Sequence, residues 1–184
     1  MERIKVSENF YLDEFVDPDT YFNSADNGRS KVRQGMIDIA QFFRDTTGRA
    51  VMINNWWSYY KKNKDKKDLQ DIIDDILKSK TRRKWSGYRS PKCTIGSTRS
   101  AHKKEGAIDM KMKGKDGKWM SGKKMFALAK KHIDELYDLG LRRLEDPKIT
   151  KTWLHCDLRN RKQGAVAVVD LRKVTEFIYV KNAA

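Results

Sequence analysis

Two amphipathic helical patterns constrain the fold of this chain more than any other feature of its sequence. Apolar side chains that recur at helical spacing predict a helix over 31–46, with Ser30 as its N-cap and Gly48 as its stop signal. The same kind of pattern predicts a second helix over 122–138, which Ser121 caps. Each helix needs an apolar surface on which to bury its stripe of side chains.

Short segments of β type occur between and after these helices. Some alternate between apolar and polar side chains, others are rich in β-branched residues, and turn formers separate them. We therefore expect an α+β fold in which a mostly antiparallel sheet carries both helices on one face. The predicted strands cover 50–55, 107–113, 141–145, 152–159 and 165–180.

A strongly basic segment at 56–85 differs from the rest of the chain. Its centre predicts an amphipathic helix over 66–79, and runs rich in lysine and arginine flank that helix. We interpret the segment as a helical lobe inserted into a single domain that spans 1–184. Its aromatic side chains allow two interpretations, a platform for carbohydrate or peptide and packing of the lobe onto the fold, of which we favour packing. These side chains are Trp56, Trp57, Tyr59 and Tyr60.

Positive charge dominates the composition. The 184 residues include 40 Lys or Arg and 25 Asp or Glu, which gives a formal net charge of +15. Such a charge suits nucleic acid, an anionic cell envelope or solubility alone. No stretch approaches the roughly 18 apolar residues that a membrane span requires, and the N-terminus lacks the apolar core of a signal peptide. We therefore expect a protein made in the cytoplasm without a signal peptide. Its two cysteines, Cys93 and Cys156, are too few for a disulfide scaffold, and free thiols suit them better than a mutual bond.

Two of the three histidines lie near carboxylates in a pattern that suits a metal. His102 precedes Asp109 with small residues between them, so a turn can bring a loop histidine and a strand aspartate to one point. In the segment WLHCD, His155 and Asp157 share one face of a strand, and Cys156 points to the other. Two imidazoles and one carboxylate can hold a zinc ion with an open fourth position. His102, Asp109 and His155 are therefore candidate ligands.

Several motifs carry a resemblance to a known family. SAHKKEGAID resembles the signature S-x-H-x-x-G-x-A-x-D of the M15 family of zinc peptidases, and WLHCD resembles that family's W-x-H-x-D. GYRSP resembles the arginine-bearing loop before the first motif, and SENFYLDEFVDPDTYFN is similar to the family's N-terminal F-x-x-x-E-F segment. The resemblance covers 7–18 and 30–160 and is interrupted at 56–85. The family includes D-Ala-D-Ala carboxypeptidases and phage endolysins, so the resemblance implies a Hedgehog/DD-peptidase-like fold.

The resemblance implies roles for the matching residues. His102, Asp109 and His155 would bind one Zn²⁺ ion. Arg89 would lie near the scissile carbonyl or a substrate carboxylate, where a bidentate donor is useful, and Ser100 would hydrogen-bond the substrate backbone or its terminal group.

Two more residues would support the site, and one histidine would not. Asp157 would orient a ligand or Arg89, and Trp153 would belong to the core or to the wall of the substrate pocket. His132, in the stretch KKHIDEL, has no ligand pattern near it and suits a surface or packing role.

The chain departs from the family pattern at two positions. Glu105 stands where glycine is usual, and Thr152 stands where many members place a carboxylate three residues before the last histidine. The second departure leaves the general base open between Glu145 and Asp146, which a hairpin could bring toward His155. We favour Glu145.

The resemblance implies a zinc-dependent peptidase that cuts peptidoglycan stem peptides. Small size and positive charge suit a monomeric phage endolysin that acts at the bacterial cell wall. The lobe at 56–85 would then set target preference, and its removal should weaken wall binding more than cleavage of a small peptide. One alternative is a non-catalytic zinc-containing wall-binding or virion module, which Thr152 leaves open. Another is a nucleic-acid-binding protein, which the charge supports but no helix-turn-helix, zinc-finger or RNA-recognition signature accompanies.

Overall fold

The chain folds as an α+β protein, as its sequence predicts. A computed structural model describes residues 2–81, 83–91, 93–95, 97–98, 100–104, 106–159, 162–170 and 173–181. The helices are α1 (Pro18–Asn23), α2 (Gln34–Thr47), α3 (Trp57–Asn63), α4 (Leu69–Lys78), α5 (Ala101–Lys104), α6 (Gly122–Lys131) and α7 (Ile133–Asp138), with 3-10 turns at Leu12–Glu14 and Arg29–Lys31. The strands are β1 (Val51–Met52), β2 (Ala107–Met112), β3 (Arg143–Glu145), β4 (Leu154–Asp157), β5 (Ala165–Asp170) and β6 (Lys173–Tyr179). No helix among these residues is long and apolar enough to cross a membrane.

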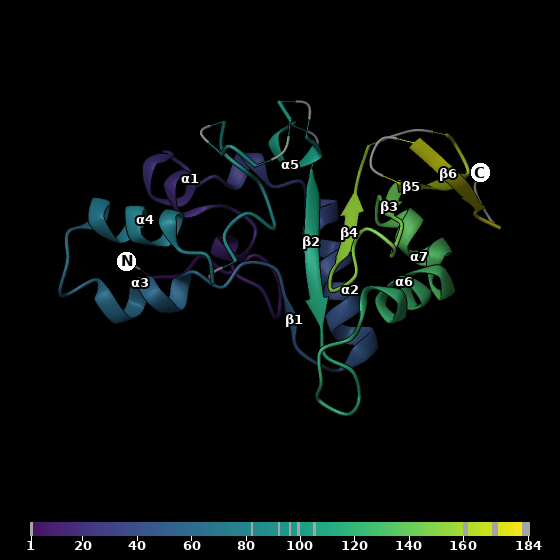
Figure 1. Ribbon diagram of the computed structural model, residues 1–184, viewed down its shortest axis with the longest axis horizontal. Coiled ribbons are helices and arrows are strands. Elements are labelled where there is room, and N and C mark those ends of the chain that lie inside the picture. The colour runs from purple at the N-terminus through teal and green to yellow at the C-terminus, as the bar shows by residue number, and fades with distance from the viewer. Residues whose placement is uncertain are drawn as a thin grey trace.

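The strands form one mixed sheet that is mostly antiparallel. Its order is β1-β2-β4-β3-β5-β6, and β3 and β5 are the parallel pair. β2 and β4 stand side by side near the middle of the molecule (Figure 1). Their register pairs Asp109 directly with His155. The sheet therefore brings together two candidate ligands that are far apart in the sequence.

The two faces of the sheet have different neighbours. Ile108 of β2 and Cys156 of β4 belong to the apolar core, to which α2, α6 and α7 also contribute buried side chains. Asp109 and His155 alternate with these residues and therefore point to the opposite face. The predicted direction of Cys156, away from the candidate ligands Asp109 and His155, is confirmed. The helices thus cover one face, and the candidate site lies on the other.

The first predicted helix is confirmed, but its predicted cap is wrong. α2 begins after Arg33, which is extended and makes no side-chain cap hydrogen bond, whereas Ser30 lies in the preceding 3-10 turn. The carboxylate of Asp26 accepts hydrogen bonds from the backbone N–H groups of Gly28 and Ser30, and so stabilises that separate turn. Gly48 ends α2 at a φ of 59°, as predicted.

The second predicted helix is divided in two at His132. This residue leaves helical geometry, with a φ of −113° and a ψ of 35°, and separates α6 from α7. Its ring packs edge-on against Phe42, and its Nδ1 lies 3.2 Å from Oε1 of Glu135. α6 contacts β4 and α7 contacts β5, so the break lets the two helices follow neighbouring parts of the sheet. His132 has the packing role that its sequence context indicates.

The first predicted strand is shorter than expected, because Asn54 forms hydrogen bonds with distant loops and not with the sheet. Only Val51–Met52 pairs with β2. The side chain of Asn54 donates to the carbonyl oxygen of Val16 and accepts from the N–H of Ser86. These contacts with distant loops replace hydrogen bonds in the sheet.

The basic lobe folds into α3 and α4 and is packed onto the rest of the molecule (Figure 1). Trp56 is fully buried against Tyr21, and Ile72 and Ile76 join the same core as the sheet. The hydroxyl of Tyr59 donates to Asp75 at 2.8 Å. The aromatic side chains therefore pack the lobe in place, and the platform interpretation is wrong for the buried Trp56. Because the lobe shares the main core, its removal would disturb the whole fold.

Candidate metal centre

Three side chains from separate elements meet on the face of the sheet opposite Ile108 and Cys156. His102 lies in α5, Asp109 in β2 and His155 in β4, and one possible ligand atom from each lies within 4.8 Å of the others. Oδ1 of Asp109 is 2.7 Å from Nδ1 of His155, and Oδ2 of Asp109 is 3.4 Å from Nε2 of His102. The three candidate ligands predicted from the sequence are therefore brought together.

Hydrogen bonds define which nitrogen of each imidazole faces the cluster. Nδ1 of His102 lies 2.8 Å from the carbonyl oxygen of Gly87 and donates to it, so the lone pair of Nε2 points to Asp109. His155 has the opposite orientation, with Nε2 3.5 Å from Oδ2 of Asp157. Backbone and carboxylate acceptors of this kind orient metal-binding histidines in proteins.

The donor set fits a zinc ion. Two imidazole nitrogens and one carboxylate oxygen form a three-ligand set with room for a fourth group. Ligands about 2.0 Å from a tetrahedral ion lie about 3.3 Å from one another, and one possible ligand atom from each of the three residues lies within 4.8 Å of the others. The buried His-Asp-His group can therefore hold a metal ion.

Burial and neighbouring charges shift the pKa values of the three groups in opposite directions. Burial lowers the pKa of His102 and would raise that of Asp109, but the two histidines hold the Asp109 pKa well below its ordinary value. Burial alone would lower the pKa of His155, but hydrogen bonds to Asp109 and Asp157 raise it to about 10. The carboxylate of Asp109 is thus held as an anion between two imidazoles.

Asp157 lies behind His155 and is held by arginines. Its side chain is fully buried, and its Oδ2 accepts hydrogen bonds from Nε and Nη2 of Arg159 at 3.2 and 2.7 Å. Nε of Arg143 lies 3.5 Å from the same oxygen. Burial would raise the pKa of Asp157, but the contacts with His155 and Arg159 lower it. The contact with the candidate ligand His155 is as expected, and the arginines that pair with Asp157 in the described part of the chain are Arg143 and Arg159, in place of the expected Arg89.

Two arginines also form hydrogen bonds with Asp109, one with its side chain and one with its main chain. Nη2 of Arg89 lies 3.1 Å from Oδ2 of Asp109, and its Nε donates to the carbonyl oxygen of Trp85 at 2.5 Å. Arg83 donates to the main-chain oxygens of Asp109 and Ile53 at 2.8 and 2.7 Å. Arg89 was predicted at the site from GYRSP, but Arg83 was missed because it lies in a basic run that suggested only a solvated surface.

The two candidates for the general base have different surroundings. Glu145 shares a face of β3 with Arg143, and its negative charge helps to raise the pKa of His155. Oδ1 of Asp146 instead accepts the backbone N–H of Lys148 at 2.8 Å and so stabilises its own turn. The β3–β4 pairing has formed as predicted.

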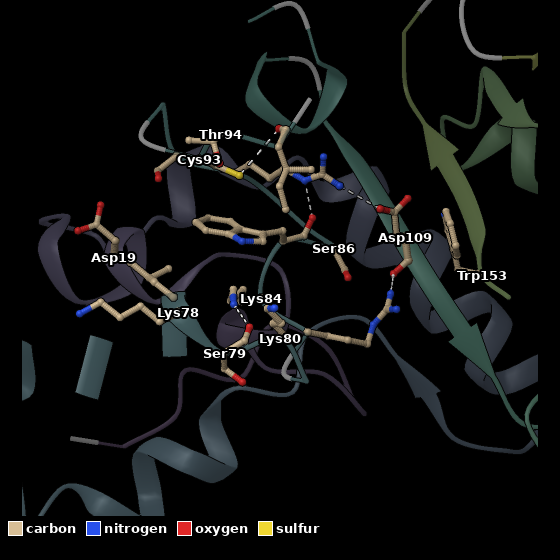
Figure 2. Close-up of a pocket in the computed structure, with 16 residues that line it drawn as sticks. Asp19, Lys78, Ser79, Lys80, Lys84, Ser86, Cys93, Thr94, Asp109 and Trp153 are labelled. Atoms are coloured by element: carbon tan, nitrogen blue, oxygen red, sulfur yellow. Dashed lines mark hydrogen bonds and ion pairs between the residues drawn. The ribbon is translucent and has the colours of Figure 1, made fainter. Parts of the chain in front are cut away.

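A cavity of about 720 Å³ opens beside the cluster (Figure 2). Asp109 and Trp153 form one side of it, and the end of α4 with the turn after it forms the other. Trp153 is thus a wall residue, one of its two expected roles. Ser100 is not among the described residues that line the cavity, and its backbone bonds to Ser97 and Lys103 place it in the turn before α5.

Both cysteines are free and buried. Cys93 lines the cavity, and Cys156 lies in the core, where burial raises the pKa of its thiol. The expectation of free thiols is confirmed, and neither cysteine belongs to the cluster of His102, Asp109 and His155.

Comparisons of the chain with protein-family models, with curated proteins and with solved structures found no significant match. The functional argument therefore depends on the site itself and on the motifs quoted from the sequence.

Proposed function

We propose that this protein is a zinc-dependent peptidase that hydrolyses peptide bonds in the stem peptides of bacterial peptidoglycan. The observation that carries the proposal is the buried His102–Asp109–His155 group, whose aspartate lies in the wall of a cavity large enough for a peptide. A structural zinc site has four protein ligands and is closed, whereas three protein ligands leave one position for a reacting group.

The residues around the cluster suit peptide hydrolysis. Zinc, when bound, would supply a Lewis acid that polarises a carbonyl and lowers the pKa of water. Glu145 would accept a proton from the attacking water and later deliver it to the leaving amine. Arg89, anchored on Asp109 and Trp85, would present its guanidinium to a carbonyl or carboxylate of the peptide.

The substrate class follows from the resemblance of SAHKKEGAID, WLHCD and GYRSP to peptidases of cell-wall peptides. A net charge of +15 is consistent with this proposal, since it would draw the protein to an anionic wall. A phage endolysin that acts at the bacterial cell wall combines these properties.

Mass spectrometry of purified peptidoglycan, incubated with the zinc-loaded protein, tests the proposal. We expect new amino and carboxyl ends at one type of peptide bond, no product in EDTA, and no product with His155→Ala. Zinc binding and wall binding without any cleavage would instead identify a non-catalytic module. Zinc-independent binding of oligonucleotides that falls steeply with salt, without cleavage, would identify a nucleic-acid-binding protein.

A further inference from the structure

The cavity beside the cluster is strongly basic on the side that the lobe at 56–85 forms. Lys78 at the end of α4, Lys80 just after it and Lys84 line this side (Figure 2). Arg83 and Arg89 also line the cavity and are hydrogen-bonded to Asp109, an acidic lining residue. The positive charge thus exceeds the negative charge along the wall.

The acidic groups of the wall do not offset this charge at the lobe. Asp109 is engaged by two imidazoles and by Arg89. The other acidic lining residue is Asp19, whose Oδ1 accepts a hydrogen bond from Asn23 at 2.9 Å. Lys78 has one exposed ion pair, 3.6 Å from Asp74, which water and salt screen.

A buried hydroxyl supplies an independent sign of a polar ligand. Ser90 lines the cavity and is 5% exposed, and its Oγ has no hydrogen-bond partner among the described residues. Buried polar groups of proteins are rarely left without a partner, since each such group costs free energy. A ligand with an acceptor oxygen could provide the partner.

We infer that this cavity is a subsite that selects peptides with a free carboxylate near the cleaved bond, through Lys78, Lys80 and Ser90. A carboxylate accepts charge-assisted hydrogen bonds from ammonium groups and from a hydroxyl. The cavity favours a peptide over a nucleic acid, because its volume is about 720 Å³ and its lining includes the indoles of Trp85 and Trp153. Binding of nucleic acid depends on a series of phosphate contacts along an extended surface.

This inference rests on the proposed function, and the test separates the two. The probes are a stem pentapeptide with D-glutamate at its second position, the same peptide with D-isoglutamine there, and the same peptide with an amidated C-terminus. Dissociation constants are measured by calorimetry with zinc-loaded Glu145→Gln protein, and kcat/KM with zinc-loaded protein that retains Glu145. The variants are Lys78→Gln/Lys80→Gln and Ser90→Ala. Lys61→Gln/Lys62→Gln is the matched control, since it removes two exposed charges from the same lobe away from the cavity.

One of the two amidations should weaken binding about tenfold in the parent protein, which equals about 1.4 kcal/mol. This loss of affinity on amidation should shrink to about twofold or less in Lys78→Gln/Lys80→Gln. It should stay about tenfold in the Lys61→Gln/Lys62→Gln control. Ser90→Ala should weaken binding of the preferred peptide about threefold, and an unchanged affinity would remove Ser90 from the subsite.

The other outcomes overturn one proposal or the other. Cleavage with no effect of either amidation, or with the same effect in all variants, would reject the subsite and leave the peptidase. Carboxylate-selective binding that depends on Lys78 and Lys80, without cleavage of any peptide, would support the subsite and reject the peptidase. A labelled oligonucleotide that binds more tightly than the peptides, with the same dependence on these lysines, would overturn the subsite in favour of nucleic acid.

Discussion

Oδ1 of Asp109 lies 2.7 Å from Nδ1 of His155, on strands whose register pairs these two residues directly. The sheet itself therefore sets the separation of two candidate ligands. Oδ2 of the same carboxylate faces Nε2 of His102 at 3.4 Å. Asp109 is thus the residue that both imidazoles contact, and its two oxygens bridge them.

Replacing this bridging carboxylate by an amide should remove the metal. Asp109→Asn keeps the shape of the side chain but removes its charge, so we expect zinc affinity to fall about 100-fold or more. Competition with a chromophoric chelator measures this change. His132→Ala, which removes the histidine outside the cluster, is the control and should bind zinc as the parent protein does. Equal zinc affinity in Asp109→Asn would contradict the assignment of the metal centre.

Glu145 and Asp146 should respond differently to the loss of their charge. Glu145→Gln should keep zinc and lose about 10²- to 10⁴-fold in kcat, the range that one acid–base group contributes. Asp146→Asn should stay within about threefold, because an amide oxygen can still accept the N–H of Lys148. Hydrolysis of a stem peptide and zinc content are measured together. Full activity in Glu145→Gln would remove it as the general base.

Gly87 contacts both the N-terminal segment and the candidate metal centre. A Cβ atom at this position would overlap the main-chain carbonyl oxygen of Phe15, while the carbonyl of Gly87 itself holds His102. Gly87→Ala should therefore cost about 2–3 kcal/mol of unfolding free energy and weaken zinc binding about tenfold. Thermal unfolding and chelator competition measure the two effects.

Gly114→Ala is the matched control for this substitution. Its Cβ would meet the flexible side chain of Asp116 at 3.0 Å, and Gly114 lies in the turn after β2, away from the cluster. We expect nearly unchanged stability and zinc affinity. A melting temperature for Gly87→Ala equal to that of the parent would show that the N-terminal segment yields to the added methyl group.

A buried carboxyl in the N-terminal segment should make stability depend on pH. Burial, together with the neighbouring charge of Asp13, raises the pKa of Glu14 from 4.5 to about 7. The folded protein therefore holds this proton more tightly than the unfolded chain does. The resulting stabilisation is fully present below pH 4.5 and is lost as the pH rises through about 7. Its magnitude is on the order of 3 kcal/mol.

Glu14→Gln should remove this part of the pH dependence. The amide stays neutral and its oxygen can still accept the backbone N–H of Tyr11. We expect the melting temperature of the parent to fall by about 5 °C or more between pH 5 and pH 8, with a clearly smaller fall in Glu14→Gln. Glu8→Gln, at an exposed position, should behave like the parent. Identical pH profiles for the parent and Glu14→Gln would contradict the prediction.

Local patterns predicted most of the elements, and tertiary contacts explain where they failed. The helix over 31–46 and the strand over 107–113 were found because an apolar stripe and an alternation are visible within one segment. The apolar spacing of 122–138 continues through His132, so the break could not be seen without its contact with Phe42. The early end of β1 depends on Asn54, whose partners lie in two distant loops.

The same distinction applies to the candidate site. The three ligands and Arg89 were predicted because their motifs name residue types with a definite chemistry. The carbonyl oxygen of Gly87 and the guanidinium of Arg83 were missed, because a backbone acceptor and a lysine-rich run carry no comparable signal. Arg159 was predictable in part, since it follows Asp157 by two residues at the end of a strand.

The sheet order also has a consequence for the synthesis of the chain. β2 pairs with β4, and α6, α7 and β3 are made between them. A ribosome-bound chain that ends before β4 has exposed His102 and Asp109 but not His155. It therefore offers two ligands where a stable zinc site needs at least three. Metal capture at this site would follow completion of the central sheet, so a bound ion would consolidate a nearly finished fold and would not nucleate it.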